Sequence, residues 1–195
     1  MAVMASERKE AFAAAAEQEL ESLCSRGVRI ACNAFSPVVL VKGDLDEAER
    51  AGGELLAGPD GKALRSALST IGWEPEDFCA LSAVAGGGDP AVDPVLVPGD
   101  VLTVDLFREA VEALDPEAII LLDNTAADLL RETYADALAI IEDFNTAMLM
   151  PGLVAQVLGR RVLALDGFEA SLTDLREKQR MWAYLKQLPP LGAPY

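Results

Sequence analysis

The sequence contains no histidine among its 195 residues. Histidine is the side chain whose unperturbed pKa lies nearest neutrality, and it is the most frequent acid–base catalyst and metal ligand in proteins. Its absence excludes Ser-His and Cys-His nucleophile pairs and every imidazole metal site. Any catalysis by this chain therefore has to use carboxylates, lysine, tyrosine, cysteine or backbone groups.

Cysteines are few, and long apolar runs are missing. Cys24, Cys32 and Cys79 lie at irregular spacing, which suits neither a disulfide framework nor a CxxC metal knuckle. We expect all three to be reduced, with Cys79 a buried hydrophobe in a strand and no iron–sulfur cluster. The longest apolar stretches, such as 118–122, are far shorter than the roughly 20 residues that span a bilayer. With no apolar signal segment before the charged residues 7–10, the sequence predicts a cytoplasmic protein without membrane contact.

Positive charge is also scarce. The chain has 16 Lys and Arg against 32 Asp and Glu, a net charge of −16. Residues 86–117 hold eight acids and one base, and only 160–186 is richer in bases, with six against four acids. Since clustered Lys and Arg supply most of the affinity for nucleic-acid phosphates, this balance argues against DNA binding.

Four short apolar runs predict buried strands at 38–42, 78–84, 118–123 and 161–166. Helical patterns fill the gaps between them and flank them. Alternating strands and helices favour right-handed crossovers and a parallel sheet covered on both faces. We predict an α/β fold, a three-layer α/β/α sandwich with a four-stranded parallel sheet, as one domain over 1–195 with an N-terminal helix in 1–30 and a short tail at 189–195. The predicted helices are 6–26 (capped by Ser6), 60–71, 104–114, 125–132, 151–158 and 171–188.

Acidic residues follow three of the four predicted strands. Asp44 and Asp46 follow the first strand, Asp123 the third and Asp166 the fourth. Because ligands of parallel α/β sheets bind at the carboxyl ends of the strands, these acids are candidates for a divalent-cation pocket. Aspartates after a strand also cap the next helix, and we favour this second interpretation.

Four segments, in the same order and at similar spacing, resemble the uracil-DNA glycosylase superfamily, particularly its iron–sulfur class. Residues 53–64 (GELLAGPDGKAL) are similar to the family's G-R-P-F-x-G-x-A-G-x-L-L stretch, and residues 71–84 resemble its I-G-(x)n-N-V-V step from helix to strand. Residues 115–127 (DPEAIILLDNTAA) resemble its third strand, which usually ends G-x-T-A, and residues 176–186 (REKQRMWAYLK) look like its closing helix, K-R-x-x-W-x-D-L-K. The resemblance implies that family's fold, with the strands ordered second, first, third, fourth across the sheet.

The positions that carry the family's activity differ here. The G-E-x-P-G motif falls at 43–47 (GDLDE), without the Pro-Gly turn. The Phe that stacks on uracil falls at Leu56, and the Asn that reads the base edge falls at Ser82, which is too short for that contact. Neither cluster-cysteine position, at 86–88 and near Thr103, holds a cysteine, and the H-P-S motif falls near 166–168 without a histidine. The resemblance therefore implies the fold and argues against the activity.

The chemistry of base excision leads to the same prediction. A glycosylase must unstack a base and stabilise a developing uracil anion, which carboxylates around the cleft oppose. We predict a glycosylase-fold protein that has lost base excision, needs no cofactor and binds an unknown protein or small-molecule partner. The candidates for its ligand cleft are Gly43, Leu56, Ser82, Asn124 and Phe168.

Two catalytic alternatives stay open. One is a residual DNA glycosylase or other nucleobase hydrolase, in which Asp44 or Asp46 activates water and Asn124 reads the base. Asn124 equally suits the cap of the helix at 125–132, and Phe168, the candidate wedge between bases, equally suits a structural place under the last helix. The other alternative is a divalent-metal-dependent phosphate enzyme that uses the acids at the strand ends.

Overall fold

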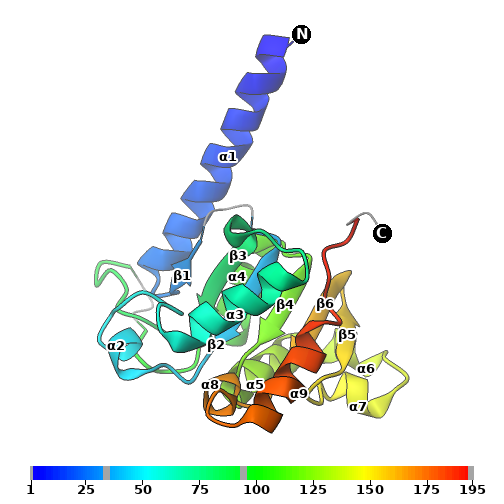
Figure 1. Ribbon diagram of the computed structural model, residues 1–195. Helices are drawn as coiled ribbons and strands as arrows, with labels where there is room; N and C mark the ends of the chain where they lie inside the picture. Colours follow the sequence, from blue (N-terminus) through cyan, green and yellow to red (C-terminus); the bar gives the residue numbers. More distant parts are fainter. Residues whose placement is uncertain (1, 33–35, 93–95, 193–195) are drawn as a thin grey trace.

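A six-stranded mixed sheet forms the centre of the molecule (Figure 1). The computed structural model describes residues 2–32, 36–92 and 96–192. The four interior strands run parallel, whereas each edge strand is antiparallel to its neighbour. The strands are β1 (Ile30–Ala31), β2 (Val38–Lys42), β3 (Phe78–Ser82), β4 (Ala118–Leu121), β5 (Val154–Val157) and β6 (Arg160–Ala164), in the order β1-β3-β2-β4-β6-β5.

The prediction of a four-stranded parallel sheet is wrong, because the sheet carries an additional antiparallel strand at each edge. The expected helix at 151–158 is instead β5, whose side chains alternate between buried and exposed toward its end. Leu158 and Gly159 both have positive φ, the backbone of a two-residue hairpin turn, so β5 leads directly into β6. β1 has only two residues and therefore leaves no periodic signal in the sequence.

Helices cover both faces of the sheet (Figure 1). One core cluster joins the sheet to α1 (Ala2–Ser25), α4 (Val104–Leu114) and α5 (Asn124–Thr133), and the other joins it to α3 (Pro59–Thr70), α8 (Phe168–Ser171) and α9 (Leu175–Leu185). Successive residues of β2 alternate between the two clusters, which explains why its apolar run is continuous. The shorter elements are α2 (Glu47–Arg50), η1 (Pro75–Asp77), α6 (Ala135–Ala139) and α7 (Phe144–Ala147).

The predicted helices differ in how well their bounds agree with the structure. The helix expected at 104–114 is confirmed as α4, which Thr103 caps through its side chain. The helix expected at 171–188 is wrong in its extent, because Asp174 caps a new helix, α9, after the short α8. Likewise, the helix start expected at Ser6 is wrong, because α1 begins at Ala2. Of the predicted tail, residues 193–195 lie outside the described residues.

Cys32 and Cys79 form a disulfide, so the expectation of three reduced cysteines is wrong. The antiparallel register pairs Ala31 of β1 with Ala80 of β3, which brings the next residue of the chain opposite Cys79. Cys79 is fully buried in β3, as the sequence predicts, but its sulfur is bonded. Cys24 is a free, exposed cysteine. The bond joins residues 47 positions apart and ties the segment after α1 to the sheet.

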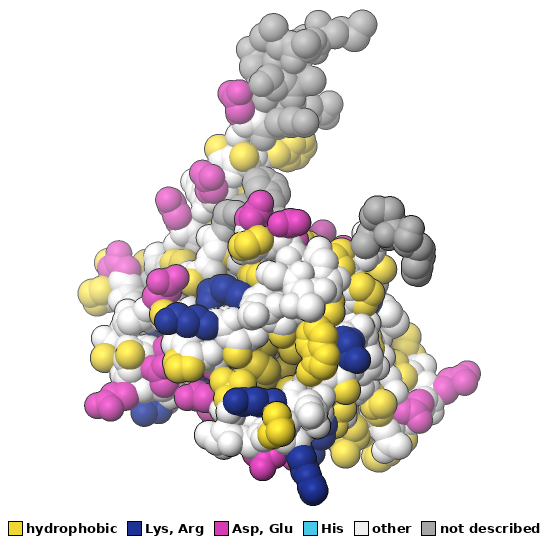
Figure 2. Space-filling model, viewed as in Figure 1, with side chains coloured by type: hydrophobic (Ala, Val, Ile, Leu, Met, Phe, Trp, Pro, Cys, Tyr) yellow, Lys and Arg dark blue, Asp and Glu magenta, His cyan; other side chains and the backbone are white. Residues whose placement is uncertain are grey.

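The helix α1 extends away from the body of the molecule (Figure 1). Its last turns pack against the body, where Leu23 is buried and Leu20 contacts the core. Just beyond the helix, Arg26 donates to Glu109 of α4 through both terminal nitrogens. Figure 2 shows acidic side chains along the part of α1 that extends outward. Among the described residues, no helix is long and apolar enough to cross a membrane.

Candidate functional site

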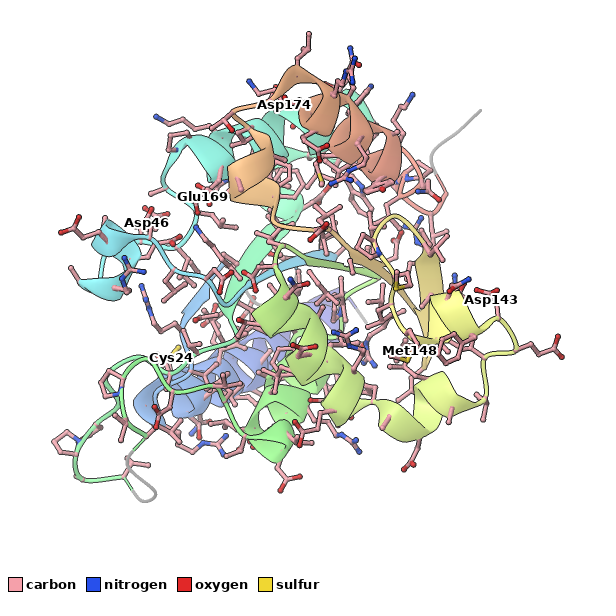
Figure 3. All side chains as sticks on the ribbon, turned by 90° about the horizontal axis from the view of Figure 1, so that it is seen from below. Cys24, Asp46, Asp143, Met148, Glu169 and Asp174 are labelled. Carbon is pink, nitrogen blue, oxygen red and sulfur yellow. A yellow bond between two sulfur atoms is a disulfide. The ribbon has the colours of Figure 1, made fainter. Side chains whose placement is uncertain are left out.

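The carboxyl ends of β2, β4 and β6 lie at one edge of the sheet, which we call the carboxyl edge. The strand order reverses at β2, because β3 lies on one side of it and β4 on the other. Ligands of α/β folds bind at such a reversal of strand order. A cavity of about 330 Å³ and a larger one of about 770 Å³ open here. Figure 3 views this region from below, with Asp46 and Glu169 on neighbouring segments.

The centre of the carboxyl edge holds a buried ion cluster around Lys42, the last residue of β2. Its side chain is only 4% exposed. The Nζ atom lies 2.7 Å from Asp60 Oδ2, 2.8 Å from Glu49 Oε2 and 3.2 Å from the half-exposed Glu169. The ammonium group donates a hydrogen bond to Asp60, and its charge is paired with all three carboxylates.

The cluster keeps Lys42 charged. Burial alone would lower the pKa of its amine, but the hydrogen bonds that the ammonium donates to Asp60 and Glu49 outweigh burial and raise the pKa above its ordinary value of 10.5. A nucleophilic or basic lysine needs the opposite shift, toward neutrality. Lys42 is therefore a structural cation, although it lines the smaller cavity.

Asp46 and Glu49 are joined in a capping box at the start of α2. Asp46 Oδ1 accepts from the Glu49 N–H at 2.8 Å, and Glu49 Oε2 accepts from the Asp46 N–H at 2.9 Å. The other oxygen of Glu49 accepts from the Leu56 N–H at 2.8 Å. Asp46, a predicted catalytic candidate, thus has the role of a helix cap, in agreement with the interpretation that we favoured from the sequence.

Asp123 is likewise a structural acid. Its carboxylate accepts from the N–H groups of Gly43 at 2.7 Å, Asp44 at 3.0 Å and Ala126 at 2.9 Å. It caps α5 and holds the turn after β2 against the start of that helix. Gly43 is required there because an added Cβ would lie 2.5 Å from the Cβ of Thr125. Gly43 itself is buried, and it lines the larger cavity.

Leu56 and Ser82, the positions where the resemblance places contacts to a base, are both fully buried. The Ser82 hydroxyl donates to the Val84 carbonyl at 2.7 Å and accepts from the Val84 N–H at 3.1 Å. Leu56 has a positive φ of 54° and packs in the core beneath α3. Neither side chain lines either cavity at the carboxyl edge, so the structure does not bring these candidates together in a cleft.

The remaining candidates have different surroundings. Asn124 is exposed at the first position of α5, and the cap expected of it is provided by its neighbour Asp123. Phe168 is buried in the core and contributes to the wall of the smaller cavity. Asp166 is half exposed, with its carboxylate 3.9 Å from Arg180. Asp44 is exposed, lines both cavities and accepts from the Thr125 hydroxyl at 3.2 Å.

The smaller cavity is strongly acidic, because four carboxylates and one ammonium line it. The larger cavity has two arginines, but Arg29 donates to the carbonyls of Glu49 at 2.7 Å and Gly53 at 2.6 Å, and Arg50 donates to the Leu45 carbonyl. Within the described residues, no group of three or more acids or cysteines is placed to hold a metal ion. An acidic cavity of this kind repels both phosphate and a developing uracil anion.

Sequence reasoning missed the Lys42 cluster, although two signals for it exist. A lysine at the end of a strand that is buried on both faces requires a carboxylate partner, and Lys42 directly follows the apolar run 38–41. The spacing of Asp46 and Glu49 matches a capping box, which predicts that Glu49 turns back toward the strand end. Nothing in the sequence indicates that Asp60 and Glu169, from α3 and α8, complete the cluster.

Comparison with protein-family models and with curated proteins found no match for this chain. The likeness to the uracil-DNA glycosylase superfamily thus rests on the segments quoted above.

Proposed function

We propose that this chain is a binding protein without base-excision activity, with a fold related to that of the uracil-DNA glycosylases. The observation that carries this proposal is the complete burial of Leu56 and Ser82. A glycosylase has to stack and read a flipped base with side chains that the base can reach. Here the two corresponding side chains are packed in the interior, and the Ser82 hydroxyl is hydrogen-bonded within its own strand end.

The charges at the carboxyl edge support the same proposal. Excision builds negative charge on the departing base, and a positively charged or neutral donor stabilises it. Lys42, the one cation among the described residues that line the smaller cavity, is already paired with three carboxylates. Asp46 and Asp123, which could activate water if free, are engaged as helix caps.

The direct test is a DNA titration and an excision assay with the full chain. We expect no uracil release from single- or double-stranded DNA at equimolar protein, and no binding tighter than micromolar at about 150 mM salt. Uracil release that scales with protein concentration, or micromolar affinity for DNA at that salt, would overturn the proposal.

A pair of substitutions makes the test sharper. If Leu56 and Ser82 faced a working cleft, Leu56→Phe with Ser82→Asn would restore family side chains without harming the fold. Because both positions are fully buried, we expect the larger side chains to destabilise the protein by about 1–3 kcal/mol each and to create no activity. Unfolding in urea and the excision assay, run on the same preparations, measure both outcomes.

A residual hydrolase is the second candidate, and Asp44 is the observation in its favour. This carboxylate is exposed, lines both cavities and accepts a hydrogen bond from the Thr125 hydroxyl. Screening nucleobase and nucleoside hydrolysis with the wild type and Asp44→Asn tests it. Asp136→Asn, which changes an exposed acid of α6, is the matched control. An activity that Asp44→Asn removes and Asp136→Asn keeps would favour this candidate over the binding protein.

A further inference from the structure

The part of the chain from α6 to the β5–β6 hairpin exposes a concentration of apolar side chains. Six of the eleven large hydrophobic residues that are exposed within the described ranges lie in 140–158. Single exposed apolar side chains are ordinary on a protein surface, but a group of them marks a place where another molecule binds. Figure 2 shows hydrophobic and acidic side chains together on the side that carries α6 and α7. The six residues are Ile140, Phe144, Met148, Met150, Leu153 and Leu158.

A groove of about 620 Å³ lies between α5, α6 and α7, in the same region. Phe144 is 73% exposed and Met148 is 40% exposed, and both line the groove beside the buried Leu138. Arg131 of α5 joins two sides of the groove, because it donates to the Met148 carbonyl at 3.1 Å and pairs with Asp128. The groove is therefore preformed, so an apolar group can enter it without a rearrangement of the helices.

The border of the groove is negatively charged. Glu132 and Glu142 line it, both are exposed, and neither has an ion pair with any residue that the structure describes. Two more exposed acids lie on its helices, Asp136 in α6 and Asp143 at the start of α7, where Figure 3 shows it. Arg131, the one base that lines the groove among the described residues, is already paired.

This charge decides between the possible occupants. Anionic lipid headgroups and nucleic-acid phosphates would meet charge of their own sign at the border. A second copy of this chain, with its net charge of −16, would also be repelled. A basic segment of a different protein would instead meet opposite charge at the border and apolar side chains inside, which is the complementarity of a specific interface.

We propose that the α5–α7 groove binds a segment of another protein in which apolar side chains are flanked by lysine or arginine. The apolar side chains pack against Phe144 and Met148, whose flexible thioether adapts to the group that enters, and the bases pair with Glu132 and Glu142. This inference rests on the proposed function and deepens it, because it names the chemistry of the partner. Uracil excision would disprove the proposed function and leave the groove, whereas failure of the binding test below would disprove this inference alone.

The test uses two labelled peptides, each of about 16 residues and built from lysine and leucine in the same proportions. In the first, the leucines follow helical spacing and form one apolar face. In the second, they are distributed evenly around the helix. We expect fluorescence anisotropy to give the first peptide a Kd of about 10–100 µM with the full chain at about 150 mM salt. The second should bind at least about tenfold more weakly, because it keeps the charge and loses the apolar contact.

Substitutions locate the binding surface. Phe144→Ala should weaken the first peptide at least about tenfold, whereas Phe12→Ala should leave the Kd unchanged, although Phe12 is an aromatic residue that is 64% exposed, in α1.

The charges at the border are tested separately. Glu132→Gln/Glu142→Gln should weaken the first peptide several-fold and reduce the dependence of its Kd on salt. The control Glu54→Gln/Glu76→Gln removes the same charge from two exposed positions outside α5–α7 and should change the Kd by less than about twofold. Circular dichroism of each variant checks that the fold is retained.

Three results are incompatible with the proposal: no binding of the first peptide up to about 1 mM, equal binding of the two peptides, or a Kd that neither the Phe144 nor the glutamate substitutions change. The other occupants have their own tests. A wild-type dimer that Phe144→Ala dissolves would assign the groove to a second copy. Binding to phosphatidylserine vesicles that Phe144→Ala abolishes would assign it to a membrane surface. Either result would also disprove the proposal.

Discussion

Replacing Lys42 by Met tests whether the carboxyl edge is held together by its buried ion cluster. Methionine replaces the apolar stem of the lysine and removes the ammonium group, which leaves Glu49 and Asp60 buried without their counter-charge. Removing one partner of a buried ion pair costs about 3–5 kcal/mol. Three backbone N–H groups still donate hydrogen bonds to the two carboxylates in this variant. We therefore expect a loss at the lower end of this range, about 3 kcal/mol.

The assay is urea unfolding followed by circular dichroism at pH 7. Lys62→Met, at an exposed position of α3, is the control and should stay within about 0.5 kcal/mol of the wild type. A double variant gives the mechanism: in the Lys42→Met background, Asp60→Asn should cost less than half of what it costs alone, because the charge that it removes no longer has a partner.

The direction of the pKa shift sets the pH range of this effect. The folded protein holds the pKa of Lys42 above its ordinary value of 10.5, so the stability from the cluster is fully present below that pH. It is lost only as the pH rises through the raised value. A Lys42→Met protein as stable as the wild type at pH 7, or costs that simply add in the double variant, would refute the reasoning.

Three further outcomes are expected. Reducing the Cys32–Cys79 disulfide, which closes a loop of 47 residues, should lower the free energy of unfolding by about 4 kcal/mol. Thiol titration of the unfolded chain should give one thiol before reduction and three after; three from the start would contradict the bond. Gly43→Ala should cost about 1–3 kcal/mol, since its Cβ meets α5, whereas Gly87→Ala has open space and should be mild; equal costs would refute the packing argument. Arg26 lowers the pKa of Glu109 through a hydrogen bond, so the stability from this pair should be present above the ordinary pKa of 4.5 and be lost as the pH falls through the lowered value. Glu109→Gln should remove that part of the pH dependence. An unchanged dependence of the free energy of unfolding on pH in the acid range would contradict this.

Local patterns in the sequence determined the interior of the fold. The apolar runs at 38–41 and 118–122 are continuous because those strands are covered on both faces, and such runs are visible without any structure. The stripe of α4 is equally local, because one face of a helix is encoded within eleven residues. The two edge strands were not predicted, because they have no clear local pattern. β1 is only two residues long, and β5 is defined by its hairpin with β6.

The candidate site was decided by tertiary structure. The sequence located Asp44, Asp46 and Asp123 at strand ends, but whether an acid is a catalyst or a cap depends on which N–H groups surround it. Lys42 acquires its partners from α2, α3 and α8, segments that lie up to 127 positions away in the chain. The disulfide likewise depends on the register between two strands. Charge and hydropathy are properties of the chain, whereas burial and pairing exist only once distant segments pack together.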